Sequence, residues 1–185
     1  MKKLNDLKIT ILCLDDNTAT NMSKAFGGMK NVFIVKSDFQ TFMADNHKID
    51  CIVSPANSYG YLTGNYDAAI SDFLGWDFQK KVQKYIDEKF YGKQPVGTSF
   101  YIKTDNNGVG LIHTPTMRIP SRIKDVHLIY QCMRTTLICA LEHNVKNIVI
   151  PPFGGGCGGI PPKVIATQMR DGYMQVALRR REREF

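Results

Sequence analysis

A run of glycines late in the chain constrains the fold more than any other feature. Five of the six residues from Gly154 to Gly159 are glycine, and the run lies between an apolar segment at 147–151 and the pair Pro161-Pro162. Glycines let a ligand approach the backbone, so that successive N–H groups can bind phosphate oxygens. Proline at a first helical position favours a helix, whose N-terminus also attracts anions. The run predicts a strand, a phosphate loop and a helix; a turn without ligand is the alternative.

The rest of the chain alternates between strand and helix patterns. Apolar segments at 7–14, 31–36, 50–55 and 147–151 predict strands, and segments at 97–103 and 108–113 predict two more around an Asn107-Gly108 turn. Helices are expected at 17–26, 39–46, 66–73, 77–90, 124–143 and from 161 or 162 to about 183, the first capped by Asn17 or Thr18. This order predicts an α/β fold with a mixed, largely parallel sheet and helices on both faces.

A second polar loop, at residues 54–67, also follows a predicted buried strand and precedes a helix. In sheets of this kind, ligands bind beyond the carboxyl ends of the strands, where both loops are expected. The Asn57 amide can donate and accept hydrogen bonds, as a sugar diol requires. Asp67, near a helix start, has a structural alternative as a helix cap. The two loops together predict a site for a phosphorylated ligand.

Two common nucleotide motifs do not fit the glycine run. Gly154, Gly156 and Gly159 match the spacing of a dinucleotide-binding fingerprint, but no strand is expected after the following helix to present an acidic ribose ligand. A P-loop would need a lysine followed by Ser or Thr after the glycines, and none is present there. The phosphate loop therefore belongs to another class.

Composition narrows the partners and the compartment. The formal charge of +7 favours an anionic partner, which could be a nucleotide, a nucleic acid or an acidic surface. The five cysteines are scattered without a C-x-x-C pair, which indicates reduced thiols and no structural metal site. No long apolar run or signal-peptide pattern is present, so we expect a cytoplasmic protein without membrane contact.

The two loops resemble those of the macro domain family, a group of ADP-ribose-binding modules, over most of the chain. Residues 54–58 (SPANS) with residues 64–70 (GNYDAAI) are similar to one family motif, and residues 151–162 to its phosphate loop. The run at 54–62 most resembles the ADP-ribose 1''-phosphate phosphatase-like branch. The resemblance implies a single domain over residues 1–185, a macro-domain-like three-layer α/β/α sandwich and no cofactor.

The resemblance also assigns residues to parts of the ligand. It places Asp38 and Phe39 at the adenine, Asn57 and the 64–66 segment at the distal ribose, and the glycine run at the diphosphate. Asp67, His113 and Asn57 are the catalytic candidates it implies, although a buried structural role is the alternative for His113. The ligand-binding candidates are Asp38, Phe39, Ala56, Asn57, Gly64, Asn65, Tyr66, Phe153, Gly154, Gly155, Gly156, Cys157 and Gly158.

Three departures from the family pattern bear on activity. The usual glycine triplet reads Thr63-Gly64-Asn65, Gly158 stands where an aromatic residue is common, and a further C-terminal strand is not expected. The implied functions are hydrolysis of ADP-ribose 1''-phosphate or of an ADP-ribosyl linkage, or binding without catalysis. A basic nucleic-acid-binding domain is the third alternative, and the sequence leaves the oligomeric state open.

Overall fold

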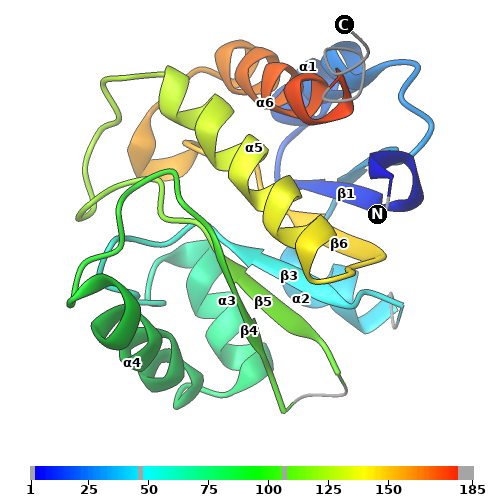
Figure 1. The fold of residues 1–185 in the computed structure, drawn as a ribbon. Coiled ribbons are helices and arrows are strands. Elements are labelled where there is room, and N and C mark those ends of the chain that lie inside the picture. The colour runs from blue at the N-terminus through cyan, green and yellow to red at the C-terminus, as the bar shows by residue number, and fades with distance from the viewer. Residues whose placement is uncertain (1–2, 46–47, 106–107, 179–185) are drawn as a thin grey trace, which may run out of the picture.

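The computed structural model describes residues 3–45, 48–105 and 108–178, and Figure 1 shows their arrangement. The elements in chain order are η1 (Leu4–Asp6), β1 (Lys8–Cys13), α1 (Asp16–Phe26), β2 (Val32–Lys36), α2 (Phe39–Asp45), β3 (Cys51–Ser54), α3 (Asn65–Leu74), α4 (Phe78–Phe90), β4 (Phe100–Lys103), β5 (Gly110–His113), α5 (His127–Glu142), β6 (Asn147–Ile150), η2 (Gly156–Gly158) and α6 (Pro162–Leu178).

One six-stranded sheet carries the fold, in the order β2-β1-β6-β3-β5-β4. All neighbouring pairs are parallel except β4 and β5, which pair antiparallel. This confirms the predicted mixed, largely parallel sheet. The predicted Asn107-Gly108 turn cannot be compared in full, because Asn107 lies outside the described residues.

Helices cover the sheet on both faces. Helices α1, α5 and α6 pack over one face, where Val53 of β3 joins their apolar cluster. Helices α2, α3 and α4 pack over the other, where the next residue back, Ile52, joins a second cluster. Since successive strand side chains point to opposite faces, a strand buried on both sides needs the continuous apolar run seen here.

One expected helix start was wrong. The cap of α1 is Asp15, whose Oδ1 accepts the Thr18 N–H at 2.8 Å, and not Asn17 or Thr18. Asp15 is the residue directly before α1, so its carboxylate can accept a backbone N–H of the first helical turn. In the described part of the chain, no helix is long and apolar enough to cross a membrane.

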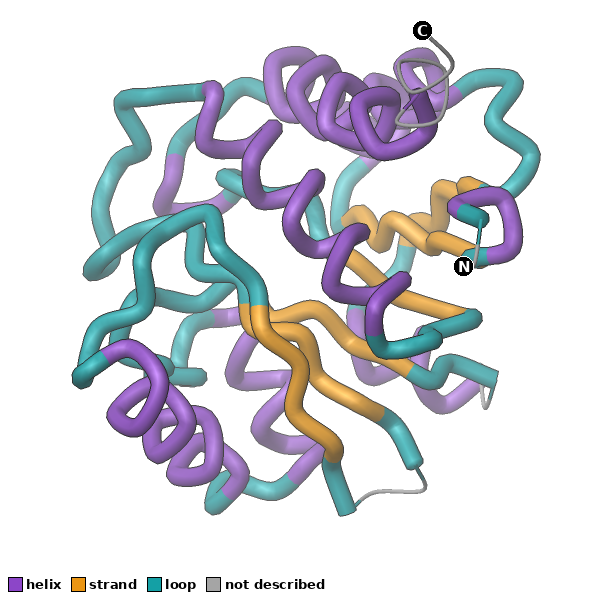
Figure 2. Tube along the Cα trace, viewed as in Figure 1, coloured by secondary structure: helices purple, strands orange, loops and turns teal. Residues whose placement is uncertain are grey.

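The parallel strands bring the functional loops to one edge of the sheet. β1, β2, β3, β5 and β6 all end there, and Figure 2 shows long loops gathered on that side. Asp38 follows β2, Asn57 follows β3, and the glycine run follows β6. From β2 to β3 the sheet order contains three strand spacings, or about 14 Å. This edge is therefore long enough for an extended ligand to lie across it.

Candidate functional site

Asn57 holds the first loop, residues 54–67, in shape. Its Oδ1 accepts the N–H of Tyr59 at 3.1 Å and of Tyr61 at 3.5 Å, and its Nδ2 donates to the Tyr61 carbonyl at 3.1 Å. The residue is 8% exposed. An amide has a second N–H, so one donor remains for a ligand after these bonds. Asn57 thus shapes its loop as well as lying at the predicted ribose position.

Asp67 lies in the first turn of α3, behind the same loop. Gly64 is the N-cap of this helix, so the carboxyl group of Asp67 does not occupy the cap position; its Oδ1 instead accepts the Ser54 hydroxyl at 2.7 Å. Burial raises the pKa of Asp67 from 3.8 to about 7, although the Ser54 bond acts in the opposite direction. A carboxyl group with this pKa can give or take a proton near neutrality.

Gly64 lies beside Asp67. A Cβ placed on Gly64 would lie 3.9 Å from Oδ2 of Asp67, which is ordinary van der Waals contact. Asn65, the next residue, is exposed. Thr63-Gly64-Asn65 replaces the usual glycine triplet, and its central residue, Gly64, is therefore the one that lies beside the Asp67 carboxyl group.

Tyr66 joins the first loop to the predicted adenine end. Its ring packs edge-on against Phe39, with centroids 5.4 Å apart. Its hydroxyl is buried and has no hydrogen-bond partner among the described residues, and burial raises its pKa. Tyr66 therefore serves mainly to pack α2 against α3, rather than as an exposed ligand contact.

Asp38 lies at the start of α2 with an exposed carboxylate. Its two oxygens accept the N–H and the hydroxyl of Thr41, both at 2.8 Å, and these bonds lower its pKa. The neighbouring Phe39 is buried beneath. Capping bonds fix the direction of the Asp38 side chain while leaving it at the surface of the sheet edge.

The glycine loop, residues 151–162, offers backbone where the first loop offers side chains. Gly154, Gly156 and Gly159 have φ of 83°, 56° and 67°, a region that L side chains disfavour. The N–H groups of Gly158, Gly159 and Ile160 bond within the loop. Among the described residues, no acceptor is seen for the N–H of Gly155 or Gly156, and both residues are exposed.

The two sides of the glycine loop are buried, and its tip is exposed. Phe153 is fully buried and Gly158 is buried, which anchors the loop on both sides, whereas Cys157 is exposed at its tip. Ala56, across the edge in the first loop, is also buried. The other four cysteines are buried, and all five are free thiols.

His113 lies in the core beneath the site. It is 0% exposed, its Nδ1 lies 2.6 Å from Oε1 of Gln94, and its ring packs against Phe100. Burial lowers its pKa from 6.5 to about 3, so the ring is neutral at physiological pH. Nε2 has no hydrogen-bond partner in the described residues. These contacts favour the structural alternative for His113 over proton transfer to a surface ligand.

A third segment of the site was missed by the sequence analysis. Residues 116–124, which we call the strap, connect the two loops. The Ser58 N–H donates to the Met117 carbonyl at 3.0 Å, and the Ile123 N–H donates to the Gly158 carbonyl at 3.0 Å. The Cys157 and Met117 sulfurs are 3.6 Å apart. The available signal was position: the strap follows β5, whose carboxyl end lies at the same edge.

The structure thus places most of the candidate site residues at the carboxyl edge of the sheet and one of them, His113, apart from the others. Asn57, Asp67, Gly64 and the glycine loop lie around the ends of β3 and β6, with Asp38 at the end of β2. His113 lies inside. In the described ranges, no group of three or more His, Cys, Asp or Glu side chains is placed to hold a metal ion.

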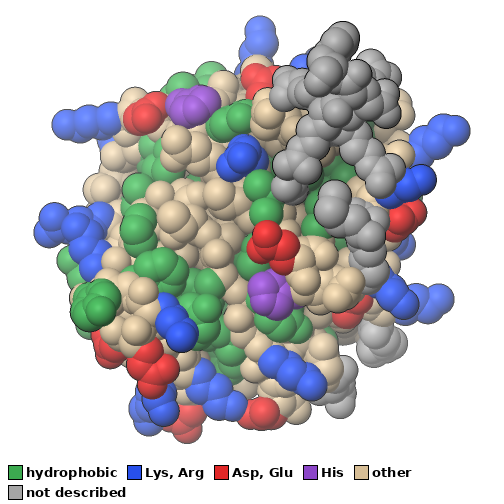
Figure 3. Space-filling view, in the orientation of Figure 1, with side chains coloured by type: hydrophobic (Ala, Val, Ile, Leu, Met, Phe, Trp, Pro, Cys, Tyr) green, Lys and Arg blue, Asp and Glu red, His purple; other side chains and the backbone are tan. Residues whose placement is uncertain are grey.

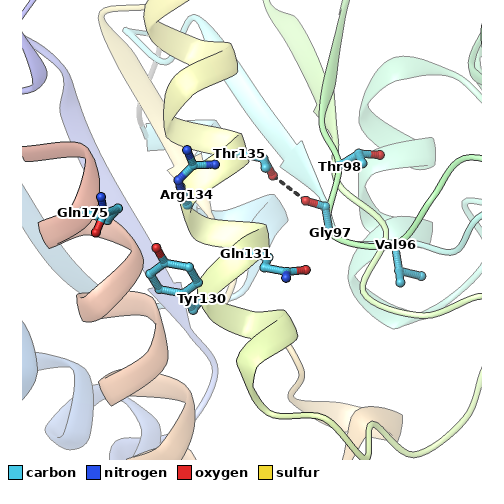
Figure 4. A pocket seen from close by; sticks show the side chains of 8 residues that line it. All are labelled: Val96, Gly97, Thr98, Tyr130, Gln131, Arg134, Thr135 and Gln175. Atoms are coloured by element: carbon cyan, nitrogen blue, oxygen red, sulfur yellow. Dashed lines mark hydrogen bonds between the residues drawn. The ribbon is translucent and has the colours of Figure 1, made fainter. Parts of the chain in front are cut away.

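A separate hollow of about 490 Å³ lies between α5, α6 and the 96–98 segment, as Figure 4 shows. One bond crosses its wall, from the Thr135 hydroxyl to the Gly97 carbonyl at 2.9 Å. Its lining residues are Val96, Gly97, Thr98, Tyr130, Gln131, Arg134, Thr135 and Gln175. None of the predicted site residues is among them, so the hollow is distinct from the sheet edge.

Solved structures of other proteins share the fold of this chain. The chain is 18% identical to the Oceanobacillus iheyensis macrodomain with MES bound, with a TM-score of 0.63 over 95% of this chain and 80% of that one. It is 19% identical to the Trypanosoma brucei macrodomain in complex with ADP-ribose, with a TM-score of 0.54 over 69% and 53% of the two chains. These structures show the same fold.

Sequence relatives agree. An uncharacterised protein of Aquifex aeolicus (strain VF5) is 28% identical over 123 residues, which are 65% of this chain and 70% of that protein. The family model described as Macro domain matches residues 53–169, from the end of β3 into α6, and so spans the first loop, the strap and the glycine loop. The chain belongs to the macro domain family.

Proposed function

We propose that the protein binds ADP-ribose or a derivative along the carboxyl edge of its sheet. The observation that carries the proposal is the glycine loop, in which exposed Gly155 and Gly156 present N–H groups without a protein acceptor among the described residues. Successive backbone N–H groups bind phosphate oxygens. Similar macrodomain structures hold ADP-ribose in a Trypanosoma brucei protein and ADPR in an Oceanobacillus iheyensis mutant.

The same edge supplies contacts for both ends of the ligand. Asp38, with its exposed carboxylate, would accept the adenine amino group beside Phe39. Asn57 would give its remaining N–H to the distal ribose, and Gly64 and Asn65 would border that sugar. The roughly 14 Å between the ends of β2 and β3 suits such an arrangement, with the diphosphate between them at the end of β6.

The catalytic part of the proposal rests on Asp67. With its pKa near 7, this carboxyl group can transfer a proton to or from water or a leaving group beside Gly64. The reaction would be hydrolysis of ADP-ribose 1''-phosphate or of an ADP-ribosyl linkage. Asn57 would orient the sugar, and the core residue His113 would support the strand beneath.

A non-catalytic binding module is the second candidate. The observation that favours it is the burial of Asp67, which is 8% exposed and already bonded to Ser54. Under this alternative, Asp67 would stabilise the first loop and take no part in chemistry.

Two measurements test these proposals. Isothermal titration calorimetry should detect ADP-ribose binding by the wild type, and a protein that binds none would overturn the proposal as a whole. Phosphate release from ADP-ribose 1''-phosphate should fall at least tenfold in Asp67→Asn, while binding persists. The control is Asp72→Asn, an exposed position on the same helix. Equal rates in wild type and Asp67→Asn would remove Asp67 from the chemistry and leave the binding module.

Domain organisation and location complete the proposal. We assign residues 1–185 to a single macro domain, in which β6 is the last strand in chain order among the described residues and α6 follows it. The four buried free thiols are in keeping with a reducing, cytoplasmic location. No cofactor enters the proposed reaction.

A further inference from the structure

The hollow between α5, α6 and the 96–98 segment has no role in the proposed function, yet it has the size of a small-molecule site. Its volume of about 490 Å³ lies within the roughly 300–1,000 Å³ that is usual for ligand pockets. Helix α5 contributes Tyr130, Gln131, Arg134 and Thr135 to its lining. Residues four positions apart lie on the same face of a helix, so this stretch of α5 forms the floor of the hollow, with α6 and the 96–98 segment as its walls.

Two glycines hold the walls of the hollow close to this floor. Gly97 has a φ of 75°, and a Cβ placed on it would lie 3.0 Å from Oε1 of Gln131. A Cβ placed on Gly172 of α6 would lie 2.6 Å from the carbonyl oxygen of Tyr130. The N–H and the carbonyl of Gly97 are both hydrogen-bonded to neighbouring segments. The width of the hollow is therefore set by backbone packing, as in a site that is formed before its ligand arrives.

Most of the polar side chains that line the hollow are left without partners inside the protein. Among the described residues, the side chains of Gln131, Arg134 and Gln175 and the hydroxyl of Tyr130 make no hydrogen bond or ion pair. The hydroxyl of Thr135, by contrast, donates to the Gly97 carbonyl at 2.9 Å. A guanidinium, a phenol hydroxyl and two amides are therefore available to a ligand.

Arg134 makes the hollow a site for an anion. The lining contains no Asp or Glu, so an anion there meets the guanidinium without repulsion from the lining. Figure 3 shows the face on which α5 lies in Figure 1: its middle is largely uncharged, and most Lys and Arg side chains project around its margins. A guanidinium binds phosphate or carboxylate through two parallel N–H bonds. The ligand is therefore expected to carry one such group on an otherwise uncharged body.

The arrangement of the donors favours phosphate over carboxylate. In Figure 4 the Tyr130 hydroxyl and the Arg134 guanidinium lie on the α6 side of α5, toward Gln175. A phosphate monoester has three terminal oxygens and can bind a guanidinium, a hydroxyl and an amide together, whereas a carboxylate has two oxygens. Gln131 points the other way, toward the 96–98 segment. Its amide can both donate and accept hydrogen bonds, which suits the hydroxyl groups of a sugar.

We infer that the hollow is a second binding site, which takes a phosphorylated sugar. Its phosphate lies against Arg134, Tyr130 and Gln175, and its hydroxyl groups lie against Gln131. The inference goes beyond the proposed function and does not rest on it, because the hollow shares no residue with the carboxyl edge of the sheet.

The first test compares four probes by calorimetry: glucose 6-phosphate, glucuronate, glucose and orthophosphate. Glucose 6-phosphate and glucuronate share a sugar ring and differ in the charged group. The wild type should bind glucose 6-phosphate at least tenfold more tightly than any of the other three. Equal affinity for glucuronate would overturn the assignment of phosphate, and equal affinity for orthophosphate would overturn the sugar contacts. Absence of glucose 6-phosphate binding at millimolar concentration would overturn the inference as a whole.

The second test uses variants to locate the bound probe. Arg134→Gln should lower the affinity for glucose 6-phosphate at least tenfold, and because Arg134 is exposed the variant should fold normally. The matched control is Arg170→Gln, an exposed arginine of α6 outside the lining, which should bind as the wild type does. Gly155→Ala, in the glycine loop, should also leave this affinity unchanged. An unaltered affinity in Arg134→Gln, or a loss in Gly155→Ala, would place the probe elsewhere and overturn the inference.

Discussion

The two loops of the candidate site are held in shape by opposite means. The first loop is held by side chains: Asn57 makes three hydrogen bonds to the backbones of Tyr59 and Tyr61, and Asp67 is buried against Ser54. The glycine loop is held by its ends, with Phe153 buried on one side, and its middle is exposed backbone. Under the proposed function, a side chain in the first loop would serve folding and binding together, whereas the exposed glycines would serve binding alone.

This difference indicates which substitutions should change ligand affinity without changing the stability of the fold. Changes to the Asn57 amide should lower both stability and affinity, because the polar atoms proposed to bind the ligand are also hydrogen-bonded inside the protein. Changes at exposed Gly155 should lower affinity without lowering stability. Substitutions in each loop and in the core beneath them test this division.

The largest expected effect concerns Asp67 and His113, two buried groups under the first loop. Their contributions to the free energy of unfolding change with pH in opposite directions. The pKa of Asp67 is raised to about 7, so native protein keeps a proton that the unfolded chain releases above pH 3.8, and stability is lost as pH rises from 3.8 to about 7. The pKa of His113 is lowered to about 3, so stability is lost as pH falls from 6.5 to 3. Between pH 4 and 6.5 the two contributions cancel in the wild type.

Single variants should expose each contribution. Relative to wild type, Asp67→Asn should become less stable toward acid and His113→Gln less stable toward neutral pH, each with a slope of up to about 1.4 kcal/mol per pH unit. Urea unfolding at half-unit steps from pH 4 to 7 measures both slopes. Asp72→Asn and His127→Gln, both exposed, serve as controls. Slopes of the same sign in the two variants would contradict the assignment.

The second prediction concerns the buried end of the glycine loop. At Gly154 a Cβ would lie 2.6 Å from Cδ1 of Ile129, and φ is 83°. Gly154→Ala should therefore lower the free energy of unfolding by about 2–3 kcal/mol through overpacking and left-handed strain. Thermal and urea unfolding measure the loss. A stability equal to wild type would show that the loop is not anchored at this end.

The third prediction concerns the amide of the first loop. Asn57→Ala removes an acceptor for Tyr59 and Tyr61 and a donor to the Tyr61 carbonyl, and should cost about 1–2 kcal/mol of stability. ADP-ribose affinity should fall in the same variant, as measured by calorimetry below its unfolding transition. Loss of affinity with unchanged stability would break the proposed contrast between the loops.

The smallest effect on stability is expected at Gly155. Its φ is −68°, and a Cβ there would meet only the Pro152 carbonyl oxygen, at 3.7 Å. Gly155→Ala should leave the unfolding midpoint unchanged but reduce ADP-ribose affinity about tenfold, or about 1.4 kcal/mol, because the added methyl group would crowd the phosphate proposed to bind there. Unchanged affinity would mean that phosphate does not lie against this residue.

Much of the fold followed from local patterns. Continuous apolar runs marked β3 and β6 as strands buried on both faces, because few other structures bury both faces of a short segment. The pair Pro161-Pro162 marked the start of α6 to within one residue, because proline has a fixed φ that suits a first helical position. The glycine run similarly indicated a tightly turned backbone, since Gly154, Gly156 and Gly159 adopt positive φ values that glycine takes without strain. The α1 cap was missed because Asp15, Asn17 and Thr18 are all suitable capping residues.

By itself, the sequence determined which kinds of residue follow each strand, and hence that glycines, an amide and an acid lie at one edge of the sheet. Only the tertiary structure decided their states. The pKa of Asp67 depends on packing around it, His113 finds its partner in Gln94, 19 residues away, and the strap reaches both loops because β5 pairs with β3. Desolvation and hydrogen bonding depend on neighbours that are distant in the chain, so no local pattern specifies them.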